Sequence, residues 1–321
     1  MNRYGATASL EISPLRRLEE AVLSHINRSC SEEEANRLRE LFEIYTAAGR
    51  TAVSQYQQPN PWLYFKLYIP DRDPMSVLSD HVSQAIEKLG RTFPVKGWWW
   101  LTKADSSGPH CRIRVAFASG HSSELAVQVN ELLGTEFRTA FIPYEPELSL
   151  FGGETGLDYA HEYFMRDSDF LVQWYQLNNG RLKGMQGISL YLAHYLMKSC
   201  ELDVFERHGV WELLRKHRNM MPVRGDTGQL LEWAKKIIRL EPESLISLHS
   251  SRAGEVLERY LRYIRCFGER LSHAYQTGRL ECGLRQYLSA LLIFHWNRAG
   301  LYYQEQTSLI SAMLEYGRDD G

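Results

Sequence analysis

The chain has 321 residues, of which 37 are Lys or Arg and 39 are Asp or Glu, so its formal net charge is −2. This length suffices for one large domain or two smaller ones with a substantial core. A balance so close to neutral does not indicate binding to nucleic acid or to an anionic membrane through bulk charge, although it is compatible with a local basic patch.

The cysteines and the N-terminus bear on the compartment. The five cysteines are odd in number and include no C-x-x-C pair, which argues against a disulfide framework or a zinc site and favours a reducing environment. The first residues, MNRYGATASLEISPL, lack the apolar core of a signal peptide, and no apolar run reaches membrane-spanning length. We therefore expect a cytoplasmic protein with no membrane partner.

The first 58 residues predict an N-terminal helical segment. Leu15, Leu18, Val22 and Ile26 recur at helical spacing. Ser31 followed by Glu34 resembles a capping box that opens a second helix. The stretch SQYQQPNP then indicates a linker.

Residues 59–150 predict a small α/β region, because the apolar period changes to two. Strands are expected at 62–69, 95–103, 110–118 and 137–146, and helices at 74–90 and 121–133, the first opened by Asp73 and Pro74. The order β-α-β-β-α-β is typical of a ferredoxin-like sheet, in which the first and third strands lie side by side at the centre. Helices then cover one face and leave the other available for binding.

Residues 151–321 predict a helical region that closes the site from the other side. Helices are expected at 154–178, 187–200, 203–218, 227–238, 251–277, 280–301 and 304–316. The fold class is therefore α+β, with the sheet followed by a mostly helical C-terminal half.

The stretch HCRIRVAF (110–117) carries the first candidate site. One face of this strand is apolar, whereas the other begins with a histidine and two arginines. Such a face is either solvated or covered by the helical half, and in the second case its charges need partners. The candidates on this cationic and aromatic surface are His110, Arg112 and Arg114, with Trp62 and Tyr64 from the first strand and Trp98 and Trp100 from the second.

The stretch LLIFHWNRAGLYY (291–303) carries the second candidate site. His295 and Arg298 continue an apolar helix stripe, with Asn297, Tyr302 and Tyr303 close by. A histidine on such a stripe is either a hydrogen-bonded core residue or part of a site. If the sheet face and this helix pack together, Arg112, Arg114, His295 and Arg298 should converge on one cavity.

Two further stretches have ambiguous roles. In YEPELSLFGG (144–153), Gly152 and Gly153 predict a turn that needs positive φ or close backbone approach. In HEYFMRDS (161–168), Asp167 and Ser168 are most simply interpreted as helix caps. Phosphate-binding loops and metal-ligand motifs are absent from the sequence, so we expect no cofactor and no metal.

Five short motifs in order, PWLYFKLY, HCRIR, YEPELSLFGG, EYFMRDS and FHWNR, resemble the C-terminal elimination domain of lantibiotic dehydratases, a module that also occurs alone in thiopeptide biosynthesis. The resemblance runs from about Trp62 to Tyr303. It implies one of two activities. One is elimination of glutamate from glutamylated Ser or Thr, and the other is a pyridine synthase reaction that joins two dehydroalanines by a formal [4+2] cycloaddition with loss of water and leader peptide.

One departure from the family pattern favours the pyridine synthase. The eliminating enzymes usually carry P-E-x-x-R-Y-G-G, and Leu150 stands where their arginine would be. Arg138 or Arg166 could compensate for that loss. Arg112, Arg114 and His295 match functional positions of the family. The resemblance thus implies a modified precursor peptide, leader plus thiazole-rich core, as the partner.

The implied roles divide the candidates into two groups. His295, Tyr302 and Tyr303 are expected to move protons, and Arg112 and Arg114 to stabilise developing oxyanions. The residues expected to bind the peptide are Trp62, Tyr64, His110, Trp98, Trp100, Asn297 and Arg298.

Two alternatives stay open at this point. One is a non-catalytic peptide-recognition subunit of the same family. The other is an RNA-binding module, which shares the strand order but would carry aromatics on the third strand, where this chain has His110, Arg112, Arg114 and Ala116. The oligomeric state is also open.

Overall fold

The computed structural model describes residues 13–29, 31–57, 62–117, 122–182, 184–220 and 228–319. The chain divides into two compact units, Met1–Asn60 and Pro61–Gly321. The first unit contains α1 (Ser13–Ser29) and α2 (Glu32–Gln57). The expected linker begins inside α2, and its remaining residues, 58–61, lie outside the described part of the chain.

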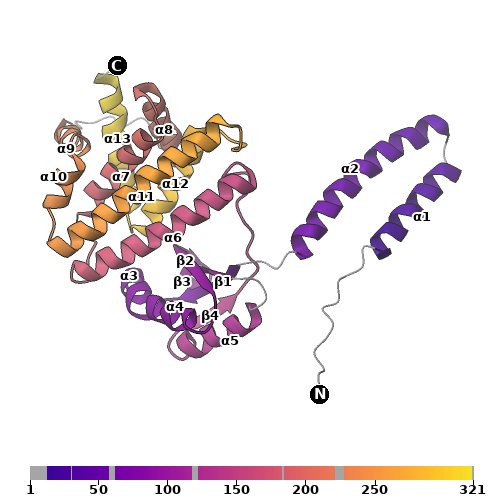
Figure 1. Ribbon diagram of the computed structural model, residues 1–321, viewed down its shortest axis with the longest axis horizontal. Coiled ribbons are helices and arrows are strands. Elements are labelled where there is room, and N and C mark those ends of the chain that lie inside the picture. The colour runs from indigo at the N-terminus through magenta and orange to yellow at the C-terminus, as the bar shows by residue number, and fades with distance from the viewer. Residues whose placement is uncertain are drawn as a thin grey trace. The chain divides into compact units, whose positions relative to one another are not determined.

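The second unit is built on a four-stranded sheet (Figure 1). Its strands are β1 (Trp62–Tyr68), β2 (Val95–Asp105), β3 (Gly108–Phe117) and β4 (Arg138–Phe141), in the order β2-β3-β1-β4. Each neighbouring pair is antiparallel. The prediction that the first and third strands form the centre of the sheet is therefore confirmed.

Short helices cover one face of this sheet. They are α3 (Pro74–Val77), the π-helical turn η1 (Leu78–Val82), α4 (Ser83–Gly90) and α5 (Ser122–Leu133). Asp73 begins α3 as predicted, because its carboxylate accepts a hydrogen bond of 2.8 Å from the Ser76 N–H. Phe65 and Ile113, which alternate with the polar residues of β1 and β3, are fully buried on this side.

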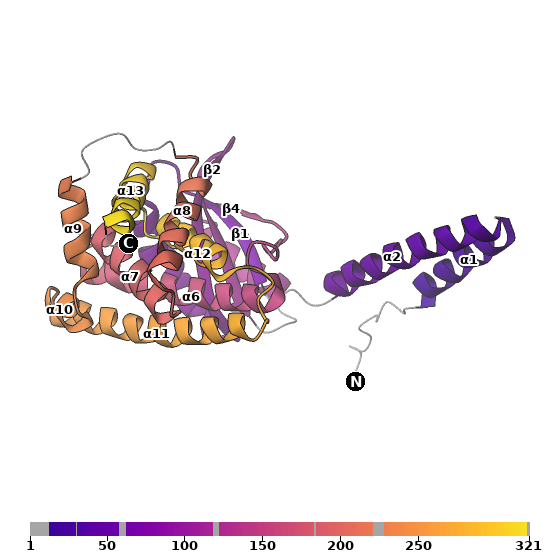
Figure 2. The same ribbon diagram turned by 90° about the horizontal axis from the view of Figure 1, so that it is seen from above.

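The rest of the second unit is helical, which confirms the α+β class. The helices are α6 (Gly153–Leu177), α7 (Met185–Ser199), α8 (Val204–His217), α9 (Gly228–Ile238), α10 (Pro242–Ser247), α11 (Ser251–Gln276), α12 (Leu284–Arg298) and α13 (Tyr303–Asp319). Of these helices, α10 was not predicted from the sequence. Both α6 and α12 pack against β2, and α11 lies across α6 and α7 (Figures 1 and 2). None of the described helices is long and apolar enough to cross a bilayer.

The turn into α6 confirms the interpretation of the paired glycines. Gly152 and Gly153 have φ of 67° and 85°, in the left-handed region. A Cβ on Gly152 would lie 2.8 Å from the backbone nitrogen of Cys282. Both the backbone conformation and the close approach therefore require glycine here.

Candidate active site on the sheet face

A buried arginine stacked among aromatic rings forms the centre of the site. The Arg114 guanidinium carbon lies 4.1 Å from the ring centre of Trp99, 4.4 Å from that of Tyr64 and 5.6 Å from that of Tyr144. Arg114 is 6% exposed, and no carboxylate pairs with it among the described residues. Burial lowers the pKa of Arg114 to about 10, so it remains a cation near neutral pH. A desolvated cation held by rings attracts oxygen atoms of a ligand strongly.

The register of β2 corrects the predicted aromatic surface. Trp99 pairs with Arg114 of β3, and Arg114 in turn pairs with Tyr64 of β1. Trp98 and Trp100 pair with Val115 and Ile113 and so point to the opposite face of the sheet. The prediction that Trp98 and Trp100 extend the surface of Trp62 and Tyr64 is therefore wrong, and Trp99 takes that place.

A tyrosine and a histidine lie beside Arg114 and were given no role by the sequence. The Tyr144 hydroxyl, from the segment after β4, lies 2.6 Å from Nε2 of His161 on α6. Burial, and then the charge of Arg114, lower the pKa of His161 to about 4, and burial raises the pKa of Tyr144. Both groups are therefore neutral near pH 7 and form a hydrogen-bonded pair that can pass a proton. The ring of Trp62 lies 4.5 Å from that of His161 and belongs to the same group. We call Trp62, Tyr64, Trp99, Arg114, Tyr144 and His161 the sheet-face cluster.

Further cations lie toward the other end of the same face. Lys103 of β2 is exposed, but its pKa is lowered by desolvation and then by Arg112 and Arg218, with Glu147 acting in the opposite direction. Arg112 is partly buried, and its Nε lies 3.5 Å from Nε2 of His110. His110 is itself inaccessible, and its Nδ1 donates to the Gly108 carbonyl at 3.1 Å. His110 therefore supports the strand and does not face a ligand. Lys103 and Arg218, together with Arg112, form the cationic end of the sheet face.

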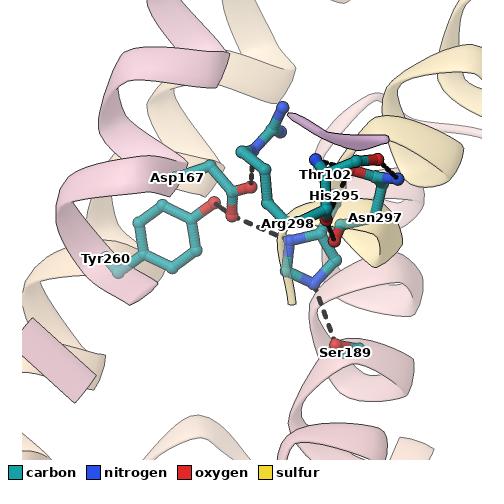
Figure 3. Close-up of polar contacts among 7 residues, drawn as sticks. All are labelled: Thr102, Asp167, Ser189, Tyr260, His295, Asn297 and Arg298. Atoms are coloured by element: carbon teal, nitrogen blue, oxygen red, sulfur yellow. Dashed lines mark hydrogen bonds and ion pairs between the residues drawn. The ribbon is translucent and has the colours of Figure 1, made fainter. Parts of the chain in front are cut away.

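A second group of polar side chains is enclosed between the helices (Figure 3). The Asp167 carboxylate on α6 accepts hydrogen bonds from the Tyr260 hydroxyl at 2.8 Å, from His295 Nδ1 at 2.8 Å and from Arg298 Nε at 2.7 Å. His295 Nε2 lies 2.9 Å from the Ser189 hydroxyl of α7. Burial raises the pKa of Asp167, but His295 and Arg298 outweigh it and bring the pKa to about 2. Asp167 lies inside α6 and is no helix cap, so that interpretation was wrong.

This network changes how His295 and Arg298 are interpreted. His295 is fully buried with both ring nitrogens engaged, so as placed it offers no atom to a substrate. The guanidinium carbon of Arg298 lies 4.6 Å from the ring centre of Phe164, which lies 4.7 Å from that of Trp99. Arg112 and Arg114 thus lie on the sheet and His295 and Arg298 between the helices, in two adjacent groups separated by the Trp99–Phe164 pair.

The two predicted tyrosines are both exposed, at 79% for Tyr302 and 55% for Tyr303. The Tyr303 hydroxyl donates to the carbonyl of Arg218 at 3.1 Å, which links it to the cationic end of the sheet face. Tyr302 instead lines a cleft of about 700 Å³ together with Trp100, Asn297 and Arg298. Within the described ranges, no group of three His, Cys, Asp or Glu side chains is placed to hold a metal ion.

Asn297 binds the edge of the sheet. Its Oδ1 accepts from the Thr102 N–H at 2.8 Å, and its Nδ2 donates to the Thr102 carbonyl at 3.0 Å. The amide thereby satisfies both backbone groups of one residue on the outer strand β2. Its side chain is engaged in the fold, although the sequence placed it among the peptide-binding residues.

Replacing Asn297 by alanine is expected to lower the free energy of unfolding by about 1–3 kcal/mol, because Thr102 loses both backbone partners in a partly buried place. Urea denaturation measures the change. Thr102→Val is the control: it removes only the longer hydroxyl contacts of 3.3 Å to Asn297 and should cost less than half as much. Equal losses in the two variants would contradict the backbone pairing as the source of stability.

Residues 62–316 match the family model described as Lantibiotic biosynthesis dehydratase C-term. No curated protein sequence matches the chain.

The chain is similar to three solved structures. The tRNA-dependent lantibiotic dehydratase MibB from Microbispora sp. 107891 is 16% identical with a TM-score of 0.62, and the match covers 82% of this chain but only 28% of MibB. TsrL is 13% identical with a TM-score of 0.56, over 81% of this chain and 94% of its own. The pyridine synthase TbtD from thiomuracin biosynthesis is 14% identical with a TM-score of 0.49, over 81% and 98% of the two chains.

Proposed function

The chain belongs to the family of lantibiotic biosynthesis dehydratase C-terminal domains, and on that premise we propose that it is a thiopeptide pyridine synthase. Its substrate is a modified precursor peptide that carries two dehydroalanines, thiazole rings and a leader. A formal [4+2] addition joins the two dehydroalanines. Loss of one water and of the leader peptide then leaves a pyridine at the centre of the macrocycle.

Leu150 is the observation that carries this choice. It lies in the turn before Gly152, partly buried against the hydrophobic core, where the eliminating enzymes resembled by this sequence place an arginine. The next residue, Phe151, packs against Phe164 and Phe294 at 5.5 Å each, directly behind Trp99. A leucine at this place cannot bind the carboxylate of a glutamyl group. The compensating residues considered above are engaged elsewhere: Arg138 lies 3.7 Å over the ring of Tyr68, and Arg166 lines a groove between α6 and α11.

The sheet-face cluster contains the groups that the cycloaddition needs. One backbone amide of the peptide must react as its imidic-acid tautomer, so a proton has to leave its nitrogen and its oxygen has to be stabilised. In this proposal Arg114, supported by Arg112, donates to the peptide oxygen, and the Tyr144–His161 pair moves the proton. This assigns to Tyr144 and His161 the role that the sequence suggested for His295. The exposed Tyr302 and Tyr303 remain candidates for contact with the peptide.

Aromatic rings and positioning supply the remainder of the catalysis. Trp62 and Tyr64 offer ring surface on which thiazoles can stack. Two dehydroalanines that are far apart in the peptide must be held at reacting distance, and this converts an improbable encounter into an intramolecular step.

Glutamate elimination is the second candidate, and the cations around Lys103 favour it. Lys103, Arg112 and Arg218 lie close enough to one another to lower the pKa of Lys103, and such a group can bind a glutamyl carboxylate. The two functions differ in the peptide that they accept.

Product masses from two peptides separate these functions. We expect the peptide with two dehydroalanines to lose one water and its leader, and the glutamylated peptide to remain unchanged. Glutamate loss from the second peptide, without reaction of the first, would replace the cycloaddition by elimination. A lack of change in both, with binding retained, would indicate a non-catalytic peptide-recognition subunit.

Substitution of Leu150 by arginine tests the same choice from within the protein. In a pyridine synthase, Leu150→Arg should lower turnover of the dehydrated peptide at least tenfold, because a new charge enters the site at a position that carries none. Leu148→Arg, in the same turn and also partly buried, is the matched control for general damage to the turn. Unchanged or increased elimination of glutamate by Leu150→Arg would argue for an eliminating enzyme.

A further inference from the structure

A second polar cavity lies in the helical half, away from the sheet. It has a volume of about 410 Å³ and is formed by α7, by the connection from α9 to α10 and by Tyr316 of α13. The views of Figures 1 and 2 agree in placing α7, α9, α10 and α13 together on the side of the unit away from β4. The cavity has the size of small-molecule sites in proteins.

One stripe of α7 supplies most of its polar groups. Tyr191, His194, Tyr195 and Lys198 follow one another at helical spacing and all line the cavity. The rings of Tyr191 and Tyr195 are stacked, with centres 5.8 Å apart and an angle of 15° between their planes. Arg239, from the end of α9, faces the same space.

These side chains have unused hydrogen-bonding capacity. Over the described residues, no partner accepts from or donates to the two tyrosine hydroxyls, the His194 ring, the Lys198 ammonium group or the Arg239 guanidinium group. Tyr191 is only 3% exposed, so its hydroxyl can meet bulk water only through the cavity. A polar group as deeply placed as the Tyr191 hydroxyl usually has a partner, and here the partner must come from outside the protein. Lys198 and Arg239 are exposed side chains that also line the cavity.

The charge of the cavity selects the kind of partner. Lys198 and Arg239 line it with no ion-pair partner among the described residues. Glu241 is the one carboxylate in the described lining, and Glu243 lies close to Tyr191. Arg207 of α8 adds a third cation close to His194. Burial, and then Arg207 and Lys198, lower the pKa of His194 to about 4. The ring is therefore neutral near pH 7 and can donate one hydrogen bond to an anion without carrying a charge of its own.

We propose that this cavity between α7, α9 and α10 binds a small organic anion through Lys198, Arg239 and His194, with its phosphate or carboxylate group on the cations and its body against Tyr191. The volume exceeds what an inorganic ion fills, which is why an organic body is included. This site is separate from the sheet-face cluster and does not depend on the reaction proposed for that cluster.

Titration calorimetry on the full chain tests the site with inorganic phosphate and with acetate, each against chloride at equal ionic strength. We expect saturable binding of at least one of the two ions. Binding of phosphate alone assigns a phosphoryl ligand, binding of acetate alone assigns a carboxylate, and binding of both assigns an anion site without preference. Lys198→Met and Arg239→Met should each weaken binding about tenfold or more, whereas Arg91→Met, on an exposed arginine paired with Glu87 in α4, should leave it unchanged.

The resonance of the His194 ring gives an independent measurement, assigned by its loss in His194→Gln. Saturating phosphate or acetate should move this resonance and raise the pH at which the ring titrates, since a bound anion favours the protonated ring. No binding above chloride, or binding that Lys198→Met and Arg239→Met leave unaltered, would overturn the proposal.

Discussion

Replacing Asp167 by alanine is expected to lower the free energy of unfolding by about 3–5 kcal/mol, a large fraction of the stability of an ordinary domain. The carboxylate is fully buried and accepts from Tyr260, His295 and Arg298, which come from two other helices. Without the Asp167 carboxylate, the guanidinium of Arg298 has no counter-charge in the interior. Its Nη atoms already lack a partner in the described structure, so the loss is not compensated by them. Urea or thermal unfolding measures the loss.

Asp169→Ala is the matched control, since this carboxylate lies on the exposed side of the same helix and should change stability by no more than about 0.5 kcal/mol. The depressed pKa of Asp167 adds a pH signature. The contribution of its ion pairs is present above the pKa of an unfolded aspartate and disappears as pH falls toward about 2. Asp167→Ala should therefore flatten the acid limb of the stability profile. An unchanged acid limb would show that Asp167 is not ionised in the folded state.

Replacing Arg114 by methionine is expected to separate activity from stability. Turnover of whichever peptide the wild-type protein converts should fall about 10²–10³-fold, the loss typical when one preorganised donor to a developing oxyanion is removed. The free energy of unfolding should change by less than about 1 kcal/mol. Arg114 is buried without a carboxylate partner, so the desolvation cost of its charge and the attraction of Trp99 and Tyr64 oppose each other.

Arg138→Met is the control for this substitution, because Arg138 also stacks on a tyrosine of the sheet, 3.7 Å over Tyr68, but lies outside the sheet-face cluster. It should retain nearly full turnover. Arg114→Lys should fall between the two, since the charge remains but the planar stacking is lost. Full activity of Arg114→Met would remove the sheet-face cluster as the catalytic centre. A loss of stability as large as that of Asp167→Ala would identify Arg114 as a structural residue.

The sequence predicted those features that depend on local patterns. The strands and most helices follow from periodicity, and the central pair of β1 and β3 follows from the order of the elements. The cap at Asp73 and the glycines of the turn follow from backbone chemistry. The six-residue α10 was missed because so short a helix carries little periodic signal.

The three consecutive tryptophans of β2 show the limit of prediction from local sequence patterns. Strict alternation puts either Trp99 or its two neighbours on the open face, and only the pairing with β3, with its irregularity between Val95 and Gly97, decides between them. The network of Asp167 could not be predicted from local patterns either. Its partners Tyr260, His295 and Arg298 are 93, 128 and 131 residues away along the chain, and no local spacing brings them together.

The pairing of Asn297 with Thr102 also restricts how a peptide can approach this fold. Peptides are often captured by adding a strand to an exposed sheet edge, through main-chain hydrogen bonds. On β2 that mode is interrupted, because the Asn297 amide already occupies the donor and the acceptor that an incoming strand would use at Thr102. A peptide running along β2 would have to displace the end of α12, whereas one lying across the sheet meets Arg114 and the rings around it without breaking a backbone pair. The fold therefore favours recognition by side chains over strand addition at this edge, so affinity here should depend on the rings and charges of the peptide more than on an extended main chain.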